Sequence, residues 1–485
     1  MFKRGKLGGL DGGLYRPLTQ SDMRRMHAGI VRILSEIGVH MPNRRAFDLF
    51  KNAGVSVDEQ RQLVFISEGF LEDCIDAAPS EIVLWGRDNP DNNIIVGGKR
   101  VHFGSGGTAL NVLDLETGEK RLSTLEDVQN VSKLLDYLDN VHFQVIPVFP
   151  NELPVTQIDI NRFFAALNNT TKHVQGGVYT MEGTKEVVEM CTMIAGSREH
   201  LQKEPFISFI TCVISPLVID KQYGDLLMTC AESGLPLSIP AEPLTGATAP
   251  VTIAGNVANL CAETLAGICL AQLVNRGTPV LMACTSTAAD PRDMSYASGA
   301  VEEGLINACA AQMAQFYGLP YYGTAGQSDS KIVDAQAGFE GAITNLLVGM
   351  AGGNFIHDAV GLLEFCMTAS YEKYVMDNEI LAEVMRVLKG VEVSDETLAI
   401  DVTAEVGPGG NFLMQPHTVR HMRQEHFIPK IADRKQRETW EQNGKKDTFV
   451  RCHEEALWIL ENHRPQPVDE AVVKKIRAEF KNFVM

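Results

Sequence analysis

The sequence predicts a (β/α)8 barrel over residues 124–429, with an N-terminal α+β extension over 1–123 and a C-terminal helical tail over 430–485. The length of 485 residues suits one large barrel with additions, or two or three average domains. From about residue 124, apolar runs alternate with helical patterns at gaps of roughly 30–45 residues, which predicts parallel strands joined by crossover helices. Eight such units favour a closed TIM barrel over a doubly wound open sheet, which remains the competing fold.

The N-terminal extension lacks this alternation. Its helical patterns cover residues 20–38, 43–53 and 67–77. Its short strand-like runs cover 62–66, 81–86 and 93–103. Gly97 and Gly98 supply a turn that predicts a hairpin within the last of these runs.

The barrel region supplies the strands and helices in turn. The expected strands are 141–148, 173–179, 206–213, 236–241, 278–284, 319–324, 354–359 and a weaker eighth at 398–405. The expected helices are 155–168, 183–196, 218–232, 252–275, 300–317, 335–350 and 371–389. In the charged tail, Pro465 and Pro467 separate two further helices, which we expect to pack on the barrel exterior or on a sister subunit.

Composition excludes several classes of protein. With 61 acidic and 43 basic residues the net charge is −18, which argues against nucleic acid as the main partner. The two longest apolar stretches, 251–284 and 341–368, are interrupted by polar residues that a bilayer would not accept. The ten cysteines form no CxxC pair and the N-terminus has no signal peptide, so we expect reduced cysteines in a cytoplasmic protein.

Candidate site residues follow from the barrel, because active sites of this fold lie at the carboxyl ends of the strands. The candidates for catalysis are Glu242, Asp329 and His357. The candidates for substrate binding are Gln175, Tyr179, Tyr321, Gln327, Lys331 and Phe355. Each also has a structural interpretation: the two acidic residues could cap helices, the histidine could be a satisfied core residue, and the aromatic residues could belong to the core.

Short motifs give weaker signals. Gly104 and Gly106 match a dinucleotide fingerprint, but a strand and turn follow instead of a helix, so we expect a tight turn close to a ligand or to another loop. We assign Gly104, Gly106 and Gly107 to cofactor approach. His417 and His421 have the spacing of a helical metal pair, but HExxH is absent and no metal is expected. Because neither GxSxG nor a P-loop is present, we expect the difficult chemistry to be supplied by a cofactor on another molecule.

Several long strings resemble one known family. They are GTALNVLDLETGEKR, PLTGATAPVTIAGNVANLCAETLAG, GTAGQSDSKIVDAQAGFEGA, SYEKYVMDNEIL and EVGPGGNFLMQPHT, and they spread over most of the chain. The sequence resembles the trimethylamine methyltransferase superfamily of corrinoid-dependent (β/α)8 barrels. Founding members carry pyrrolysine, which we expect to align in or near residues 327–334. This chain has only standard residues and therefore resembles the branch without pyrrolysine.

The resemblance implies transfer of a methyl group from a quaternary amine to cob(I)alamin on a partner corrinoid protein, with no cofactor held tightly by this chain. Glycine betaine is the expected substrate, with proline betaine and carnitine as alternatives. A quaternary ammonium leaves as a neutral amine and needs no proton, so the protein must orient, desolvate and admit the corrin. Two further alternatives are a lyase or aldolase using Lys331 as a Schiff base and a non-catalytic binding barrel. A homo-oligomer is expected.

Overall fold

A closed ring of parallel strands forms the centre of the molecule. The computed structural model describes residues 9–485. The strands of the ring are, in chain order, β7 (Arg100–Phe103), β10 (Phe143–Val145), β11 (His173–Gly177), β12 (Ile207–Ile210), β13 (Leu237–Ala241), β15 (Val280–Cys284), β18 (Tyr321–Thr324) and β19 (Phe355–His357). The ring closes between its first and second strands, where Gly104 pairs with Phe143 and the backbone N–H of His142 donates to the Phe103 carbonyl at 2.7 Å.

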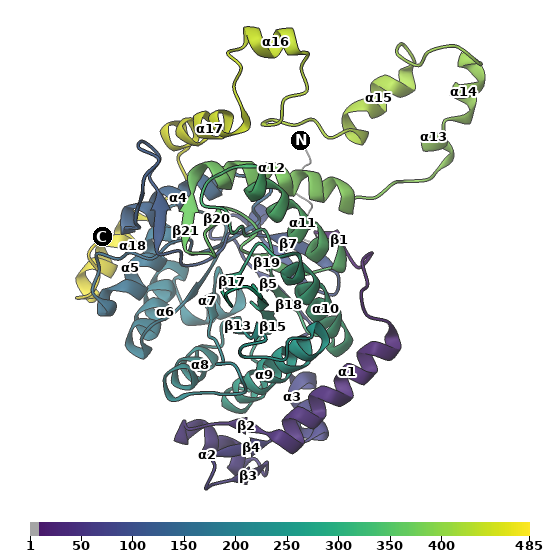
Figure 1. Cartoon of the computed structure of the whole chain (residues 1–485). Coiled ribbons are helices and arrows are strands. Elements are labelled where there is room, and N and C mark those ends of the chain that lie inside the picture. The colour runs from purple at the N-terminus through teal and green to yellow at the C-terminus, as the bar shows by residue number, and fades with distance from the viewer. Residues whose placement is uncertain (1–8) are drawn as a thin grey trace.

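A helix follows every strand of the ring and returns along its outside (Figure 1). These helices are α4 (Leu125–Tyr137), α5 (Val155–Leu167), α6 (Met181–Ala195), α8 (Lys221–Ser233), α9 (Ile253–Val274), α10 (Val301–Tyr317), α11 (Ala335–Ala351) and α12 (Tyr371–Leu388), with the short α7 (Arg198–Lys203) after α6. The predicted (β/α)8 barrel is therefore confirmed. By length and composition α9 could cross a membrane, but 83% of its most apolar window is buried inside the protein.

The ring begins earlier in the chain than the sequence pattern indicated. The run expected to be the eighth strand, 398–405, is helical and contributes α14 (Ile400–Val406), whose apolar side chains have no core to pack against. The missing strand is β7, within the predicted extension, where Val101 and Phe103 are fully buried. The prediction failed because β7 has only four residues and the expected hairpin partner, β6 (Ile94–Gly97), pairs with β5 (Glu81–Leu84) instead.

The β5–β6 hairpin closes the amino end of the barrel. Its side chains Ile82, Leu84, Ile94 and Val96 form one apolar cluster with the ring residues Phe143, Val145, Leu281, Ala283, Tyr322 and Phe355. Backbone contacts fix it there: Trp85 N–H donates to the carbonyl of Pro205, which precedes β12, and the Asn354 side chain donates to the Gly97 carbonyl. Among residues 9–485, this hairpin covers the amino end, and the loops at the carboxyl end are where this fold places its sites.

Two small sheets build the rim at that carboxyl end. One contains β14 (Leu244–Thr245), β16 (Thr287–Ala289) and β17 (Tyr296–Ala297). The other contains β8 (Asn111–Leu113), β9 (Lys120–Leu122), β20 (Leu362–Leu363) and β21 (Thr368–Ser370). Every one of these strands lies in a connection between a ring strand and the following helix, so they fix the loops in which this fold places its sites.

The N-terminal segments pack on the outside of the barrel. After β1 (Leu10–Asp11), which pairs with β7, they comprise α1 (Gln20–Arg32), the π-helical turn η1 (Ile33–Ile37), α2 (Arg44–Asn52), α3 (Glu68–Ala77), the 3₁₀ turn η2 (Pro90–Asn92) and the sheet of β2 (Val39–His40), β3 (Ser56–Asp58) and β4 (Leu63–Phe65). All three α-helices contact α9. This segment therefore covers the long apolar helix and completes its burial.

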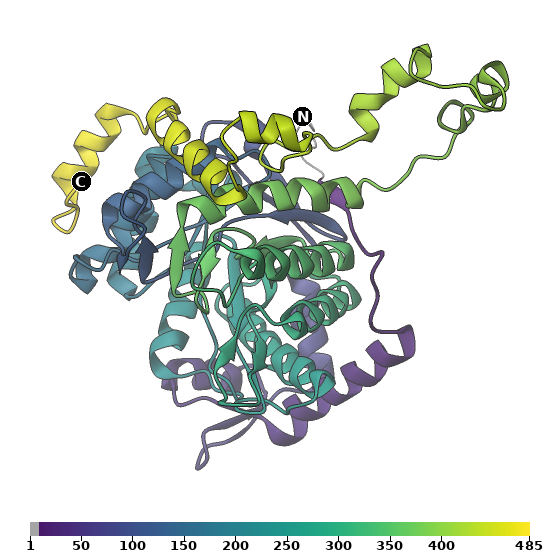
Figure 2. The same ribbon diagram turned by 45° about the horizontal axis from the view of Figure 1, so that its top comes forward.

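The chain after α12 leaves the barrel and then returns to it. Residues 390–428, here called the arm, carry α13 (Asp395–Leu398), α14 and α15 (Pro416–Glu425) and project far from the barrel (Figures 1 and 2). The chain then forms α16 (Arg437–Gln442), α17 (Thr448–Asn462) and α18 (Glu470–Glu479). The last two helices lie on either side of Pro465 and Pro467, as predicted, and α17 packs on α12 and α4 through buried Cys452, Ala456 and Ile459.

Candidate active site at the strand ends

Asp358 links three strand-end segments. It directly follows β19 and has a φ of 58°, a left-handed conformation that is uncommon outside glycine. Its carboxylate lies 2.9 Å from Nε2 of His357, accepts a hydrogen bond from the Gln327 side chain and accepts a second at 3.2 Å from the backbone N–H of Gly107. Backbone strain of this kind persists only where surrounding contacts impose it, and it concentrates at functional sites.

His357 is held in one orientation. Its Nδ1 lies 2.8 Å from the Gly323 carbonyl, which can only accept, so the proton of this bond belongs to the ring. The ring stacks on Tyr322 with 4.2 Å between centroids. Its Nε2 faces the Asp358 carboxylate, so the two side chains form one contact at the carboxyl end of β19.

Carboxyl groups gather on the same side of the barrel. Glu242 directly follows β13 and is exposed to solvent, yet desolvation by the surrounding loops raises the pKa of its carboxyl group. Glu303, in the first turn of α10, is fully buried and neither of its carboxyl oxygens has a hydrogen-bond partner. Burial raises the pKa of Glu303 well above its usual range, and repulsion from Asp358, Asp329 and Glu242 adds to the effect.

Asp329 belongs to this group of carboxylates and does not cap a helix. It accepts from the backbone N–H and the hydroxyl of Ser298, at 2.9 and 2.7 Å, and partial burial raises its pKa. The N-cap of α11 is Asp334. Lys331 is exposed, donates to the Asp329 carbonyl and lies over the Phe365 ring. An exposed amine lacks the desolvation that a Schiff-base lysine needs, which disfavours the aldolase alternative.

A buried arginine contacts the loops at the ends of two other ring strands. Arg162 on α5 donates to the Tyr179 hydroxyl at 2.9 Å and to the Thr108 hydroxyl at 3.1 Å, while its Nε has no partner. Its guanidinium also lies 5.3 Å from the centre of the Tyr179 ring, a cation–π contact. Burial raises the pKa of the neighbouring Asp159 to about 6, an effect that Arg162 opposes.

The glycine loop after β7 contacts both an acidic and a basic side chain of the site. Gly104 closes the ring against Phe143, and a side chain at Gly106 would collide with the Asp358 carboxylate. The loop contacts Asp358 through Gly107 and Arg162 through the adjacent Thr108. These contacts explain why glycine is needed here, and no helix begins at this loop, in agreement with the rejection of a dinucleotide site.

Three predicted binding residues lie away from the carboxylates. Tyr321 donates to Asn307 on α10 and so faces the helix layer, because alternation along β18 turns Tyr322 inward in its place. Phe355 begins β19 and packs at the closed amino end, against Phe143. Gln175 is fully buried within the ring and donates to the Ser238 hydroxyl at 3.0 Å. The structure therefore does not bring these three side chains to the strand-end cluster.

Four residues of the site were not among the predicted site residues. Asp358 immediately follows the chosen His357, and its position alone could have marked it. Glu303 and Arg162 lie on helices, in runs that gave no sign of facing a site. Tyr296, in the rim strand β17, donates to the Thr285 carbonyl at 3.3 Å, lies beside Glu242 and was hidden in a polar connection. Strand-end reasoning finds residues in loops and overlooks those that reach the site from helices.

Similarity to known proteins identifies the family of this chain. A sequence profile described as trimethylamine methyltransferase (MTTB) matches residues 11–484. The chain belongs to the trimethylamine methyltransferase family. A trimethylamine methyltransferase MttB of Desulfitobacterium hafniense (strain DSM 10664 / DCB-2) is 36% identical over 460 residues, which cover 95% of this chain and 92% of that protein. A glycine betaine methyltransferase of D. hafniense strain Y51 is 33% identical, with 96% of both chains covered.

The fold of this trimethylamine methyltransferase family member agrees with a solved relative. The monomethylamine methyltransferase MtmB of Methanosarcina barkeri superimposes with a TM-score of 0.52 at 14% identity, covering 95% of this chain and 96% of that one. At that identity the likeness shows the fold alone. The two Desulfitobacterium relatives have different substrates in their names at similar identity, so family membership leaves the amine open.

Proposed function

We propose that this methyltransferase takes a methyl group from glycine betaine and delivers it to cob(I)alamin on a partner corrinoid protein. One observation carries the proposal: the loop after β7 contacts the Asp358 carboxylate through Gly107 and the buried Arg162 guanidinium through Thr108, so an acidic group and a basic group lie beside the same loop. A betaine has the matching charges, a quaternary ammonium and a carboxylate separated by a short spacer. Trimethylamine has no carboxylate to engage an arginine.

The ammonium fits the acidic side. Glu242 and Asp358 supply negative charge, and the aromatic side chains of Tyr296 and Tyr223 lie near Glu242. Contact between a cation and an aromatic face is worth about 0.5–2 kcal/mol. Because the positive charge disappears as the methyl group leaves, moderate attraction serves the reaction better than a tight ion pair.

The carboxylate fits the side of Arg162. The guanidinium already spans Tyr179 and Thr108, and its Nε is a buried donor without a partner. A buried unpaired donor is costly, and a carboxylate ligand would satisfy it. We propose that the corrin approaches past the loop containing Gly104, Gly106 and Gly107, and that Gln327, whose amide donates to Asp358, borders the substrate.

Beyond binding the substrate, the reaction requires the chain only to orient it and to exclude water. The partner's cob(I)alamin is a strong nucleophile, which takes the methyl carbon while the bonding pair of the C–N bond stays on nitrogen, leaving a neutral tertiary amine. No proton is transferred to the leaving group. The residues Glu242, Asp358 and Arg162 then orient the substrate with one methyl toward the open end, and the rim sheets exclude water around it. The stretch 327–334 supplies Gln327 and Asp329 and contains no pyrrolysine.

The test is a substrate panel with a reduced corrinoid protein, followed by loss of the cob(I)alamin absorption. We expect glycine betaine to consume cob(I)alamin in equimolar amount and to yield dimethylglycine, whereas trimethylamine leaves it unchanged. Activity with trimethylamine alone, or with proline betaine or carnitine but not glycine betaine, would overturn the substrate assignment. Stoichiometric binding of glycine betaine without any demethylated product would support the non-catalytic alternative instead.

A further inference from the structure

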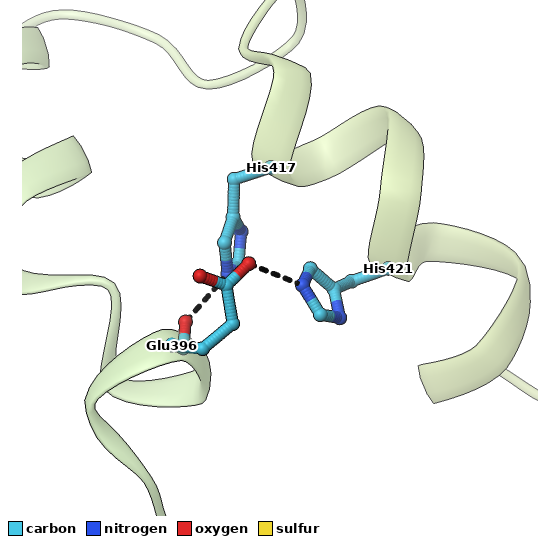
Figure 3. Close-up of side chains that lie close together, drawn as sticks. All are labelled: Glu396, His417 and His421. Atoms are coloured by element: carbon cyan, nitrogen blue, oxygen red, sulfur yellow. Dashed lines mark hydrogen bonds and ion pairs between the residues drawn. The ribbon is translucent and has the colours of Figure 1, made fainter.

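The arm carries a cluster of metal-ligating side chains that methyl transfer does not use. Glu396 on α13 lies beside His417 and His421 on α15, and both imidazoles face it (Figure 3). The three side chains offer donor atoms that all lie within 4.8 Å of one another. Because the histidines are four residues apart on a helix, they share one face, with 4.3 Å between ring centroids.

The hydrogen bonds around the cluster leave nitrogen and oxygen lone pairs that can bind a cation. Nε2 of His417 lies 2.9 Å from the Glu396 backbone carbonyl, so that nitrogen carries the proton and Nδ1 keeps its lone pair. Arg420 and His421 both contact the carboxylate oxygen Oε1 of Glu396, at 2.8 and 3.0 Å. A carboxylate has two oxygens, so Arg420 can remain on Oε1 while Oε2 binds a metal, and Nε2 of His421 then exchanges its contact with Oε1 for the metal. Outer hydrogen bonds of this kind commonly orient metal ligands.

The arm also needs a cross-link, because burial does not hold it together. None of the residues of α13, α14 and α15 is buried. Beyond the root of the arm, the side-chain contacts to Glu396 join its outgoing limb to its returning limb. Ordering such a segment costs conformational entropy that an exposed polar cluster offsets poorly. A bound metal supplies that free energy directly, as in small domains that lack a core.

We propose that Glu396, His417 and His421 bind one Zn²⁺ ion that fastens the two limbs of the arm. Two imidazoles and one carboxylate are a common zinc ligand set, with water in the fourth, open position. The cluster lies on the arm, outside the strand-end site, so the ion has a structural role that is independent of the substrate.

The test uses the full-length protein, stripped with a chelator and titrated with Zn²⁺ alone by calorimetry. We expect one bound equivalent, and Co²⁺ in its place should give the visible absorption of a tetrahedral site. His417→Ala and His421→Ala should each weaken binding by more than about 100-fold. His200→Ala, which removes an exposed histidine of α7, is the matched control and should bind like the parent protein.

A second measurement does not depend on the titration. Trypsin cleaves after Arg420 and Arg423 on the arm, and Zn²⁺ should slow this cleavage in the parent protein but not in His421→Ala. Because no residue of α15 is buried, both histidine variants should keep the thermal stability of the barrel. Absence of a bound equivalent, or equal binding by parent and histidine variants, overturns the proposal and leaves the cluster as a set of hydrogen bonds.

Discussion

Asp358 combines backbone strain with three polar contacts, which makes it the residue that most directly links position to chemistry. In Asp358→Asn, an NH₂ group replaces one carboxylate oxygen and the negative charge is lost. The amide then offers an N–H donor where Gln327 and His357 need an acceptor. We expect kcat/KM for glycine betaine to fall by about 10²-fold or more, as for removal of one preorganised electrostatic contact. Asp334→Asn, which keeps a good helix cap, is the control, and equal kcat/KM in the two variants would argue against this role.

Arg162 gives a prediction that separates the two ends of the substrate. Arg162→Lys keeps a positive charge but loses the fork that spans Tyr179 and Thr108. We expect the dissociation constant of glycine betaine to rise about 30-fold, the equivalent of about 2 kcal/mol, while that of tetramethylammonium stays unchanged. Calorimetry with both ligands measures this, with Arg198→Lys as a control on α7. A parallel loss of both affinities would show that the variant had disturbed the whole site.

For single residues, the sequence predicts which ones lie at the strand ends better than it predicts which side chains they contact. Glu242, His357 and Gln327 lie at the carboxyl ends of strands, as the barrel pattern requires. The choice between Tyr321 and Tyr322 failed because two adjacent strand residues face opposite sides, and an apolar run buried on both faces does not reveal which side is inward. Arg162 and Glu303 come from helices, where burial, and not periodicity, decides what they face.

At the scale of elements, the contact between β7 and β10 closes the barrel. Gly104 lies at that seam, and a Cβ there would collide with the Phe143 ring. We expect Gly104→Ala to destabilise the protein by about 1–3 kcal/mol, the usual cost of overpacking, measured as a lower melting temperature. Gly69→Ala is the matched control, since its Cβ meets no atom within 4 Å and alanine favours the helix α3. Equal melting temperatures for both variants would contradict the importance of the seam.

Glu263 on α9 binds the loop before α8, and its raised pKa predicts that the stability of the protein depends on pH. It accepts from the Ser215 hydroxyl and the Leu217 N–H, and burial raises its pKa from 4.5 to about 7. Because the folded pKa exceeds the unfolded one, its stabilising contribution is complete below pH 4.5 and is lost as pH rises to about 7, a change of about 3 kcal/mol. Glu263→Gln should therefore gain in melting temperature relative to the parent protein between pH 5 and 7.5, unlike the exposed control Glu199→Gln.

The element pattern was predictable except where elements are short or exposed. Alternation revealed seven of the ring strands, because each is a buried run flanked by a long amphipathic or apolar helix. β7 was placed in the extension because its four residues follow a glycine turn that resembles a hairpin. The 398–405 run has β-branched residues but no partner strand, and as an exposed segment it follows local helical preference.

At the scale of the whole molecule, the arm exposes apolar side chains that nothing in a single copy of the chain covers. Its apolar side chains are exposed, among them Met414 at 90%, Val391 at 82% and Leu413 at 77%. Exposed apolar surface of this extent is typical of a protein–protein interface. The arm follows the last residue of α12, a helix that starts at the carboxyl ends of the strands and returns along the barrel to the amino end. The root of the arm therefore lies at the end of the barrel opposite the strand-end site. A second copy can therefore bind the arm without covering the strand-end site.

This arrangement predicts that the arm holds copies of the chain together. Its root is closed by Arg386 and Lys389, which donate to the carbonyls of Glu425 and Gln424, so a short Gly-Ser linker can replace residues 391–423. We expect the parent protein to be an oligomer by light scattering and the shortened chain to be a monomer with an unchanged melting temperature. Leu413→Asp with Met414→Asp should weaken association without a deletion, because each buries a charge in the apolar contact. If the shortened chain keeps the parent's molar mass, the copies associate through another surface and the arm must bind a different protein.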